Sequence, residues 1–128
     1  MKQEILTPDA PQPIGPYSQA IKVSGGREML FISGQIAIDP STGQFQNGTL
    51  EEQTQLVMKN LLAVLQAAGM DYSHLVKTTI FLTDMADFSA MNGVYAAALG
   101  EHFPARETVA VKALPANAKV EISGIAVK

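Results

Sequence analysis

Apolar side chains recur with the period of an α-helix over residues 50–69. One face of this segment collects five of them: Val57, Leu61, Val64, Leu65 and Ala68. Thr49 followed by Glu52 forms a T-x-x-E capping box at its start, and Gly69 supplies a stop. The pattern therefore predicts a capped amphipathic helix.

A second helical pattern covers residues 86–100. Its apolar face consists of Phe88, Met91, Tyr95 and Ala98. Asp84 or Asp87 lies near its start, and Gly100 ends it. Gly93 inside the segment weakens the helix by about 1 kcal/mol relative to alanine.

Five segments are typical of β-strands: 17–23, 29–34, 75–83, 106–113 and 119–127. Gly25 and Gly26 suit a two-residue hairpin turn between the first two strands, and Leu114–Asn117 suggests a second hairpin between the last two. The order is β-β-α-β-α-β-β. This order predicts an α+β fold in a single domain, 1–128, in which two helices cover one face of a mixed sheet.

The other face of this sheet also needs cover. We expect it to carry side chains that are too apolar to remain fully exposed to solvent, such as Thr78, Ile80, Ile125 and Val127. The mean hydropathy is slightly positive, +0.12, and only 16% of the residues are charged. Both features favour cover by other subunits.

Charge and residue usage exclude several classes of function. The net charge is -3 with no run of Lys or Arg, which disfavours nucleic acid as a partner. The chain has no cysteine, and its two histidines, His74 and His102, have no i,i+4 partner, so neither thiol chemistry nor a metal site is expected. No apolar stretch has the length of a spanning helix or a signal peptide. We expect a soluble, cytoplasmic protein with no cofactor and no membrane partner.

Two charged residues interrupt otherwise apolar strands. Arg106 opens one strand and Glu121 lies inside another, and the only other arginine is Arg27 in the Gly-Gly turn. A buried charge is costly unless it is paired or used. Arg106 could be a rim residue in a subunit salt bridge, and Glu121 could face solvent by simple strand alternation.

Four motifs run collinearly along nearly the whole chain: PIGPYSQA (13–20), ISGQIAIDPSTG (32–43), KTTIFLTDMADFSAMNGVY (77–95), and PAR-x-T-V followed by LP and VEI (104–122). With these motifs the sequence resembles the RidA (YjgF-type) reactive-intermediate deaminases, also described as the endoribonuclease L-PSP family. The spacing of Pro-Ala-Arg, Leu-Pro and Val-Glu-Ile makes the resemblance specific.

The resemblance implies a chorismate-mutase-like (bacillar) fold and a homotrimer with clefts between subunits. It implies a 2-iminobutanoate/2-iminopropanoate deaminase, which hydrolyses enamine or imine intermediates such as 2-aminoacrylate to 2-keto acids and ammonia. PLP-dependent dehydratases release these intermediates. The expected ligand is thus a small imino or keto acid.

The resemblance also assigns roles to residues. Arg106 would bind the substrate carboxylate and Glu121 would orient the attacking water, with Tyr17 beside them as a third catalytic residue. The matching substrate-binding positions are Ser33, Gly34, Phe88, Asn92, Thr108 and Pro115. The residue types suit the chemistry, because an Arg fork binds a carboxylate bidentately and a carboxyl group can pass a proton either way. Simpler interpretations stay open: Tyr17 and Phe88 could be packing residues, and Asn92 a capping or solvated one.

Two departures from the family pattern stand beside Arg106. Glu107 occupies a position that is usually small and neutral, and it could lie outside the cleft or pair with Arg106. Thr108 replaces the usual cysteine. Two other functions stay open: a non-enzymatic binder of small keto or amino acids that regulates a partner, and an RNase or translation inhibitor.

Overall fold

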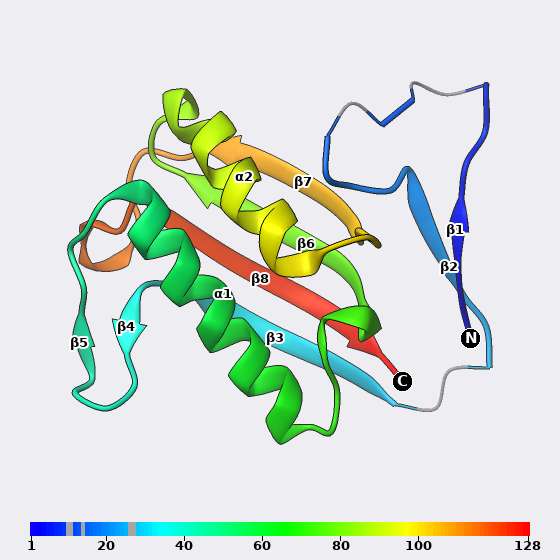
Figure 1. The fold of residues 1–128 in the computed structure, drawn as a ribbon, viewed down its shortest axis with the longest axis horizontal. Helices are drawn as coiled ribbons and strands as arrows, with labels where there is room; N and C mark the ends of the chain where they lie inside the picture. Colours follow the sequence, from blue (N-terminus) through cyan, green and yellow to red (C-terminus); the bar gives the residue numbers. More distant parts are fainter. Residues whose placement is uncertain (10–11, 14, 26–27) are drawn as a thin grey trace.

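Two helices lie across one face of a mixed sheet, and a separate two-stranded ribbon projects beside it (Figure 1). The structure is a computed structural model that describes residues 1–9, 12–13, 15–25 and 28–128. In chain order the strands and α-helices are β1 (Lys2–Ile5), β2 (Ala20–Val23), β3 (Met29–Gln35), β4 (Ile38–Asp39), β5 (Gln44–Phe45), α1 (Leu50–Ala67), β6 (Leu75–Leu82), α2 (Phe88–Leu99), β7 (Ala105–Ala110) and β8 (Val120–Val127). Three 3₁₀ turns join them, η1 (Tyr72–His74), η2 (Met85–Asp87) and η3 (Pro115–Asn117).

The four-stranded sheet has the order β3-β8-β6-β7. β6 and β7 are parallel, because α2 carries the chain back across the sheet between them, whereas β8 is antiparallel to both β3 and β6. The expectation of an α+β fold with two helices and a mixed sheet is confirmed.

Both helices begin close to where the pattern predicts them. The Thr49 hydroxyl accepts from the Glu52 amide at 3.1 Å, and the Glu52 carboxylate accepts from the Thr49 amide at 3.0 Å, which completes the capping box of α1. Gly69 follows the helix at φ +73, and Gly100 follows α2 at φ +85. α2 starts at Phe88 rather than residue 86, because residues 85–87 form the turn η2.

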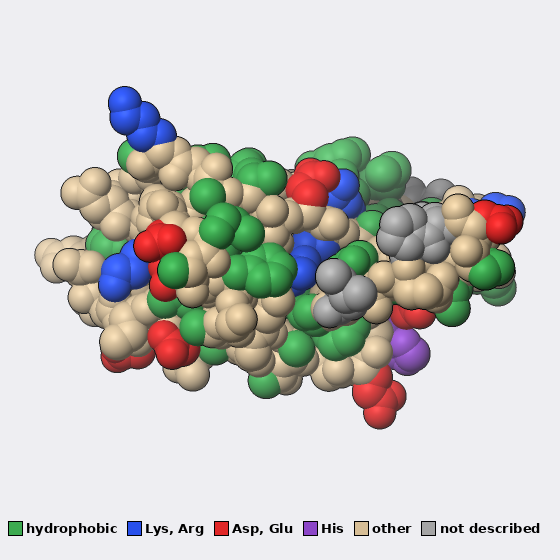
Figure 2. Space-filling view, turned by 90° about the horizontal axis from the view of Figure 1, so that it is seen from above, with side chains coloured by type: hydrophobic (Ala, Val, Ile, Leu, Met, Phe, Trp, Pro, Cys, Tyr) green, Lys and Arg blue, Asp and Glu red, His purple; other side chains and the backbone are tan. Residues whose placement is uncertain are grey.

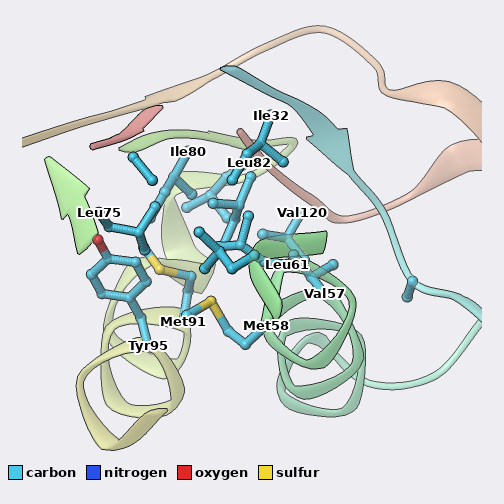
Figure 3. Close-up of a cluster of buried hydrophobic side chains, with 14 of the residues drawn as sticks. Ile32, Val57, Met58, Leu61, Leu75, Ile80, Leu82, Met91, Tyr95 and Val120 are labelled. Carbon is cyan, nitrogen blue, oxygen red and sulfur yellow. The ribbon is translucent and has the colours of Figure 1, made fainter. Parts of the chain in front are cut away.

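The core lies between the helices and the sheet (Figure 3). Val57, Leu61 and Leu65 of α1 are fully buried in it, whereas Val64 and Ala68 lie at the exposed margin of the predicted apolar face. Met91 and Tyr95 of α2 are also fully buried. Within the described residues, no helix is both long and apolar enough to span a membrane.

The first predicted hairpin is wrong. β2 pairs with β1, from Lys2 opposite Val23 to Ile5 opposite Ala20, and β3 pairs with β8 instead. Gly26 and Arg27 of the expected turn lie outside the described residues. A Gly-Gly pair indicates a reversal of the chain, but it does not select a strand's partner, and the N-terminal segment competes for β2.

The second predicted hairpin is also wrong, because β6 lies between β7 and β8. The helical crossover places β7 on one edge of β6, and β8 occupies the other edge. The segment 114–117 therefore spans one strand, and the 3₁₀ turn η3 lies within it.

The face of the sheet that turns away from the helices differs in part from the expectation. Thr78 and Ile80 are fully buried, and they belong to the helix-covered face. The open face carries Ile125 together with apolar side chains that the pattern did not single out, Phe31, Phe81 and Val109. Phe31 is 70% exposed and Val109 is 46% exposed, so this face remains strongly apolar.

The capping box makes a testable contribution to stability. Thr49→Ala removes the hydroxyl that accepts from the Glu52 amide, so the free energy of unfolding should fall by about 1 kcal/mol. Urea denaturation at one fixed protein concentration measures this change. Gln55→Ala, at an exposed position inside α1, is the control and should not destabilise the protein. An equal loss in both variants would contradict the capping role.

Candidate functional site

Arg106 is directed by strand register to the helix-covered face of the sheet. In the parallel ladder it lies opposite Thr78 of β6, and paired residues point to the same face. The Thr78 hydroxyl is hydrogen-bonded to the Tyr95 hydroxyl of α2 at 2.7 Å, which identifies that face as the one beneath the helices. The arginine thus sits half-buried at the edge of the sheet, next to α2.

Its guanidinium group is surrounded by one amide and three rings. Nη1 donates to Oδ1 of Asn92 at 2.7 Å. The ring centroids of Tyr17, Phe88 and Tyr95 lie 5.6, 5.6 and 5.3 Å from Cζ of Arg106, within cation–π range. We call these three rings the aromatic box. Phe88, Asn92 and Tyr95 occupy positions i, i+4 and i+7 of α2, so one helical face supplies most of the surroundings.

The remaining ring, Tyr17, comes from the loop before β2. The Tyr17 amide donates to the Gly15 carbonyl at 2.8 Å in a tight turn, and the Ser18 amide donates to the Pro104 carbonyl at 3.1 Å. The Ser18 hydroxyl also donates to the Phe103 carbonyl. The two bonds of Ser18 fasten the loop to the start of β7. Figure 2 shows basic side-chain atoms recessed among hydrophobic ones near the middle of this side of the molecule.

The site holds a cation with no counter-ion among the described residues. Burial lowers the pKa of Arg106, and the neighbouring tyrosines oppose this shift, but an arginine remains charged at any physiological pH. Among the described residues, no carboxylate lies within ion-pair distance of its guanidinium group. A half-buried arginine surrounded by neutral side chains is suited to bind an anion from outside.

A second unsatisfied group lies on the same strand face. The Thr108 hydroxyl is buried and has no hydrogen-bond partner in the described part of the chain. Residues 106 and 108 are two positions apart in β7, so their side chains point to the same side of the sheet. A buried hydroxyl without a partner is rare in folded proteins and suggests that a ligand or another chain completes it.

Glu107 points away from this site. Its carboxylate accepts from Lys77 Nζ and from the Thr79 hydroxyl, both at 3.1 Å, on the open face of the sheet. These hydrogen bonds, with Lys77 first, lower the pKa of Glu107. Strand alternation therefore turns Glu107 to the opposite face from Arg106, as predicted, and the alternative pairing with Arg106 is wrong.

Glu121 also lies on the open face, opposite to Arg106. It pairs with Phe81 of β6, which is three residues from Thr78 and therefore points to the other side of the sheet. Its side chain crosses Gly34 of β3 so closely that a Cβ at Gly34 would lie 2.2 Å from Oε2 of Glu121. Glycine at position 34 is thus what makes room for the glutamate.

Eight of the nine predicted site residues fall into two groups within one chain, and Pro115 belongs to neither. Tyr17, Phe88, Asn92, Arg106 and Thr108 gather on the helix-covered side around β7. Glu121 and Gly34, with the exposed Ser33 beside it, lie on the open face. Pro115 opens the turn η3 that leads into β8. The sheet therefore separates Arg106, the candidate for binding a carboxylate, from Glu121, the candidate acid–base group.

Tyr95 and Thr78 are neighbours of the site that the sequence pattern does not single out. The pattern places Tyr95 only on the apolar face of the helix, although its spacing from Phe88 and Asn92 is a signal that could place it beside them. Thr78 becomes a neighbour only through the parallel register with Arg106. Burial raises the pKa of Tyr95 to about 12, so this ring is neutral at physiological pH.

Comparison with known proteins adds to this geometry. Residues 7–128 match the family model described as endoribonuclease L-PSP. A RutC family protein of Pyrococcus horikoshii is 49% identical over 128 residues, covering 100% of this chain and 99% of that protein. The human 2-iminobutanoate/2-iminopropanoate deaminase is 41% identical, covering 100% of this chain and 91% of that protein.

A solved structure has a similar fold over almost the whole chain. Escherichia coli TdcF, solved with bound serine, has a TM-score of 0.74 at 39% identity, covering 98% of each chain. The similarity therefore extends through every element around Arg106 and Glu121.

Two glycine substitutions test the geometry of the open face. Gly34→Ala should displace the Glu121 carboxylate, because the new Cβ would lie 2.6 Å from Cδ of Glu121. Gly93→Ala in α2 is the matched control: its Cβ meets nothing within 4 Å, so it should leave Glu121 in place and stabilise the helix by about 1 kcal/mol. Crystal structures and thermal unfolding of both variants measure these effects. An unmoved Glu121 in Gly34→Ala would refute the close contact.

Proposed function

This chain belongs to the Rid family, whose sequence model is described as endoribonuclease L-PSP, and from that premise we propose that it hydrolyses small 2-imino acids to 2-keto acids and ammonia. The proposed substrates are 2-iminobutanoate and 2-iminopropanoate, with their enamine tautomers such as 2-aminoacrylate. PLP-dependent dehydratases are the proposed source. The reaction consumes one water and needs no cofactor.

One observation carries the proposal: the half-buried guanidinium group of Arg106 has no carboxylate beside it among the described residues. A small 2-imino acid offers a permanent negative group, its carboxylate. Among the described residues Arg106 donates only to Asn92, through Nη1, so the other N–H groups of the guanidinium remain for a two-point contact. The Thr108 hydroxyl, which has no partner among the described residues, is a further group on that face for the bound ligand.

The relatives support the same class of ligand. The human relative is named a deaminase of 2-iminobutanoate and 2-iminopropanoate. The structure of TdcF contains serine, an amino acid with the carboxylate and nitrogen on one carbon. We extend this ligand class to the Arg106 site of the present chain.

In the proposed chemistry, the Glu121 carboxylate transfers protons between the water and the substrate nitrogen. Water adds to the C=N carbon of the imine, and the nitrogen takes a proton, which gives a carbinolamine. The hydroxyl proton then moves to nitrogen, the C–N bond breaks, and ammonia leaves as the C=O bond forms. A carboxylate that accepts the proton of water and returns it to nitrogen serves both steps. Imines hydrolyse readily in water, so positioning and one acid–base group suffice.

The proposed site is built from two copies of the chain. Arg106 and Glu121 point to opposite faces of one sheet, so a single copy cannot present both to one small substrate. The exposed apolar open face, with Phe31 at 70% exposure, favours a copy packed against it. We therefore propose a homotrimer in which each cleft combines Arg106 of one subunit with Glu121 of the next.

The direct test generates 2-aminoacrylate or 2-iminobutanoate in situ with a PLP-dependent dehydratase and follows keto-acid formation with and without this protein. Accelerated formation supports the deaminase. Binding of 2-oxobutyrate without acceleration would instead indicate a keto-acid-binding regulator. RNA cleavage that persists in Arg106→Ala would indicate the RNase.

Substitutions at Arg106 should impair both ligand binding and turnover, whereas a substitution at Glu121 should impair turnover alone. Arg106→Lys keeps the charge but loses the fork, and its rate should fall at least about tenfold; Arg106→Ala should lose both keto-acid binding and turnover. Glu121→Gln keeps size and hydrogen bonding, so it should bind 2-oxobutyrate as wild type does while its rate falls about 10²–10⁴-fold. Calorimetry beside early-time rates separates the two roles. Normal turnover in Arg106→Ala would remove Arg106 from the site.

Mixed trimers test the two-copy cleft. Arg106→Ala and Glu121→Gln subunits, each inactive alone, are co-refolded in equal amounts. About three-quarters of random trimers are mixed, and each mixed trimer has one cleft with an intact Arg106 and an intact Glu121, so about a quarter of wild-type activity should return. Sedimentation equilibrium checks the trimer. A stable monomer at micromolar concentration, or a mixture as inactive as its parents, would contradict the inter-subunit site.

A further inference from the structure

Tyr95 is a core residue whose hydroxyl contacts Thr78 and whose ring contacts Arg106. It is 0% exposed, in the middle of α2, and its oxygen lies at the end of the side chain farthest from the helix (Figure 3). The hydroxyl is hydrogen-bonded to Oγ1 of Thr78 at 2.7 Å, and the ring centroid lies 5.3 Å from Cζ of Arg106. The ring of Tyr95 has no exposed surface, so the contact that it makes at the site is with Arg106.

Strand register explains why one tyrosine makes both contacts. Thr78 and Arg106 are direct neighbours in the parallel ladder of β6 and β7, on the same face. Tyr95 lies over this pair: its hydroxyl is bound to the first strand, and its ring faces the cation on the second. The hydrogen bond to Thr78 fixes the height and tilt of the ring against the sheet, and the ring in turn limits where the guanidinium group can lie.

We propose that Tyr95 is a positioning residue, which orients the guanidinium plane of Arg106 for the carboxylate of the ligand without touching the ligand itself. The inference rests on the proposed function, because orientation of Arg106 matters only if Arg106 binds the substrate.

Orientation matters because the arginine side chain is long and flexible. A bidentate contact needs the guanidinium plane and the carboxylate plane to coincide. Asn92 fixes Nη1, and the ring of Tyr95 restricts rotation about that contact from the buried side. Because burial raises the pKa of Tyr95 to about 12, the phenol stays neutral and does not compete with the ligand for the cation.

The first test compares substitutions that remove or retain the ring. Tyr95→Leu should weaken 2-oxobutyrate binding about tenfold in calorimetry and raise KM for the imine by a similar factor, while kcat falls less than about threefold. Tyr95→Phe keeps the ring and should bind within about threefold of wild type. The matched control is Tyr72→Leu: Tyr72 donates its hydroxyl to the Met58 carbonyl at 2.6 Å, at another part of the core, and its loss should leave binding unchanged.

A second readout does not depend on activity. The chain has only two arginines, so a spectrum of protein labelled with ¹⁵N-arginine contains two Nε–H signals, and Arg27→Lys assigns them. The Arg106 signal should show a ring-current shift in wild type and in Tyr95→Phe. Tyr95→Leu should move it toward the free-arginine position, while Tyr72→Leu should leave it unchanged.

The outcomes separate the two ideas. An unmoved Arg106 signal in Tyr95→Leu, unchanged binding in that variant, or equal losses in Tyr72→Leu would overturn the positioning role alone. A wild-type protein that neither binds 2-oxobutyrate nor accelerates imine hydrolysis would overturn the proposed function and the positioning role together. The arginine spectra of wild type and Tyr95→Leu, compared with each other, would still show whether the contact between Arg106 and the Tyr95 ring exists.

Discussion

The structure around the candidate site depends on a permanent cation that is held half-buried with no carboxylate beside it in the described part of the chain. Removing Arg106 from water is unfavourable, and the described residues offset this with neutral groups only: one amide oxygen from Asn92 and the faces of three aromatic rings. Such surroundings hold the guanidinium group in place without neutralising it. The charge therefore remains available to a ligand, and a carboxylate that enters gains an attraction weakened less by water than at an exposed arginine. A salt bridge to Glu107 would have removed this property, and strand alternation prevents it by turning Glu107 to the other face.

Four segments must agree for this arrangement to exist: β6, α2 and β7, which follow one another in the chain, and the distant loop before β2. The parallel register of β6 and β7 places Arg106 beside Thr78, and α2, the crossover between those strands, presents Phe88, Asn92 and Tyr95 to it. The loop before β2 supplies Tyr17 and is fastened to the start of β7 through Ser18. The site is thus supported on a strand and a helix that also form the core, which favours a preorganised geometry over one that forms only when ligand binds.

The sheet itself separates the two charged candidates. Glu121 and Arg106 point to opposite faces, and the glutamate lies over Gly34, where any larger residue would meet its carboxylate. A close packed sheet admits no substrate between its faces, so cooperation between these two residues requires a second copy of the chain. The exposed Phe31 and Val109 on the face of Glu121 are consistent with such packing. In this arrangement, assembly and catalysis would depend on the same surface.

The sequence by itself determined the elements whose signals are local. The capping box at Thr49 and Glu52, the apolar period of both helices and the glycines after them place α1 and α2 to within a few residues, because these signals act over one or two turns. The motif around Arg106 and Glu121 likewise identified the family. Only the tertiary structure decided which strands pair: two hairpins suggested by turn residues do not form, since pairing depends on distant partners that a turn does not specify. For the same reason the sequence could not show that Tyr95 and Thr78 lie behind Arg106, or that Glu121 faces the other way. These relations follow from register and from a helical crossover, which bring together side chains that are far apart along the chain.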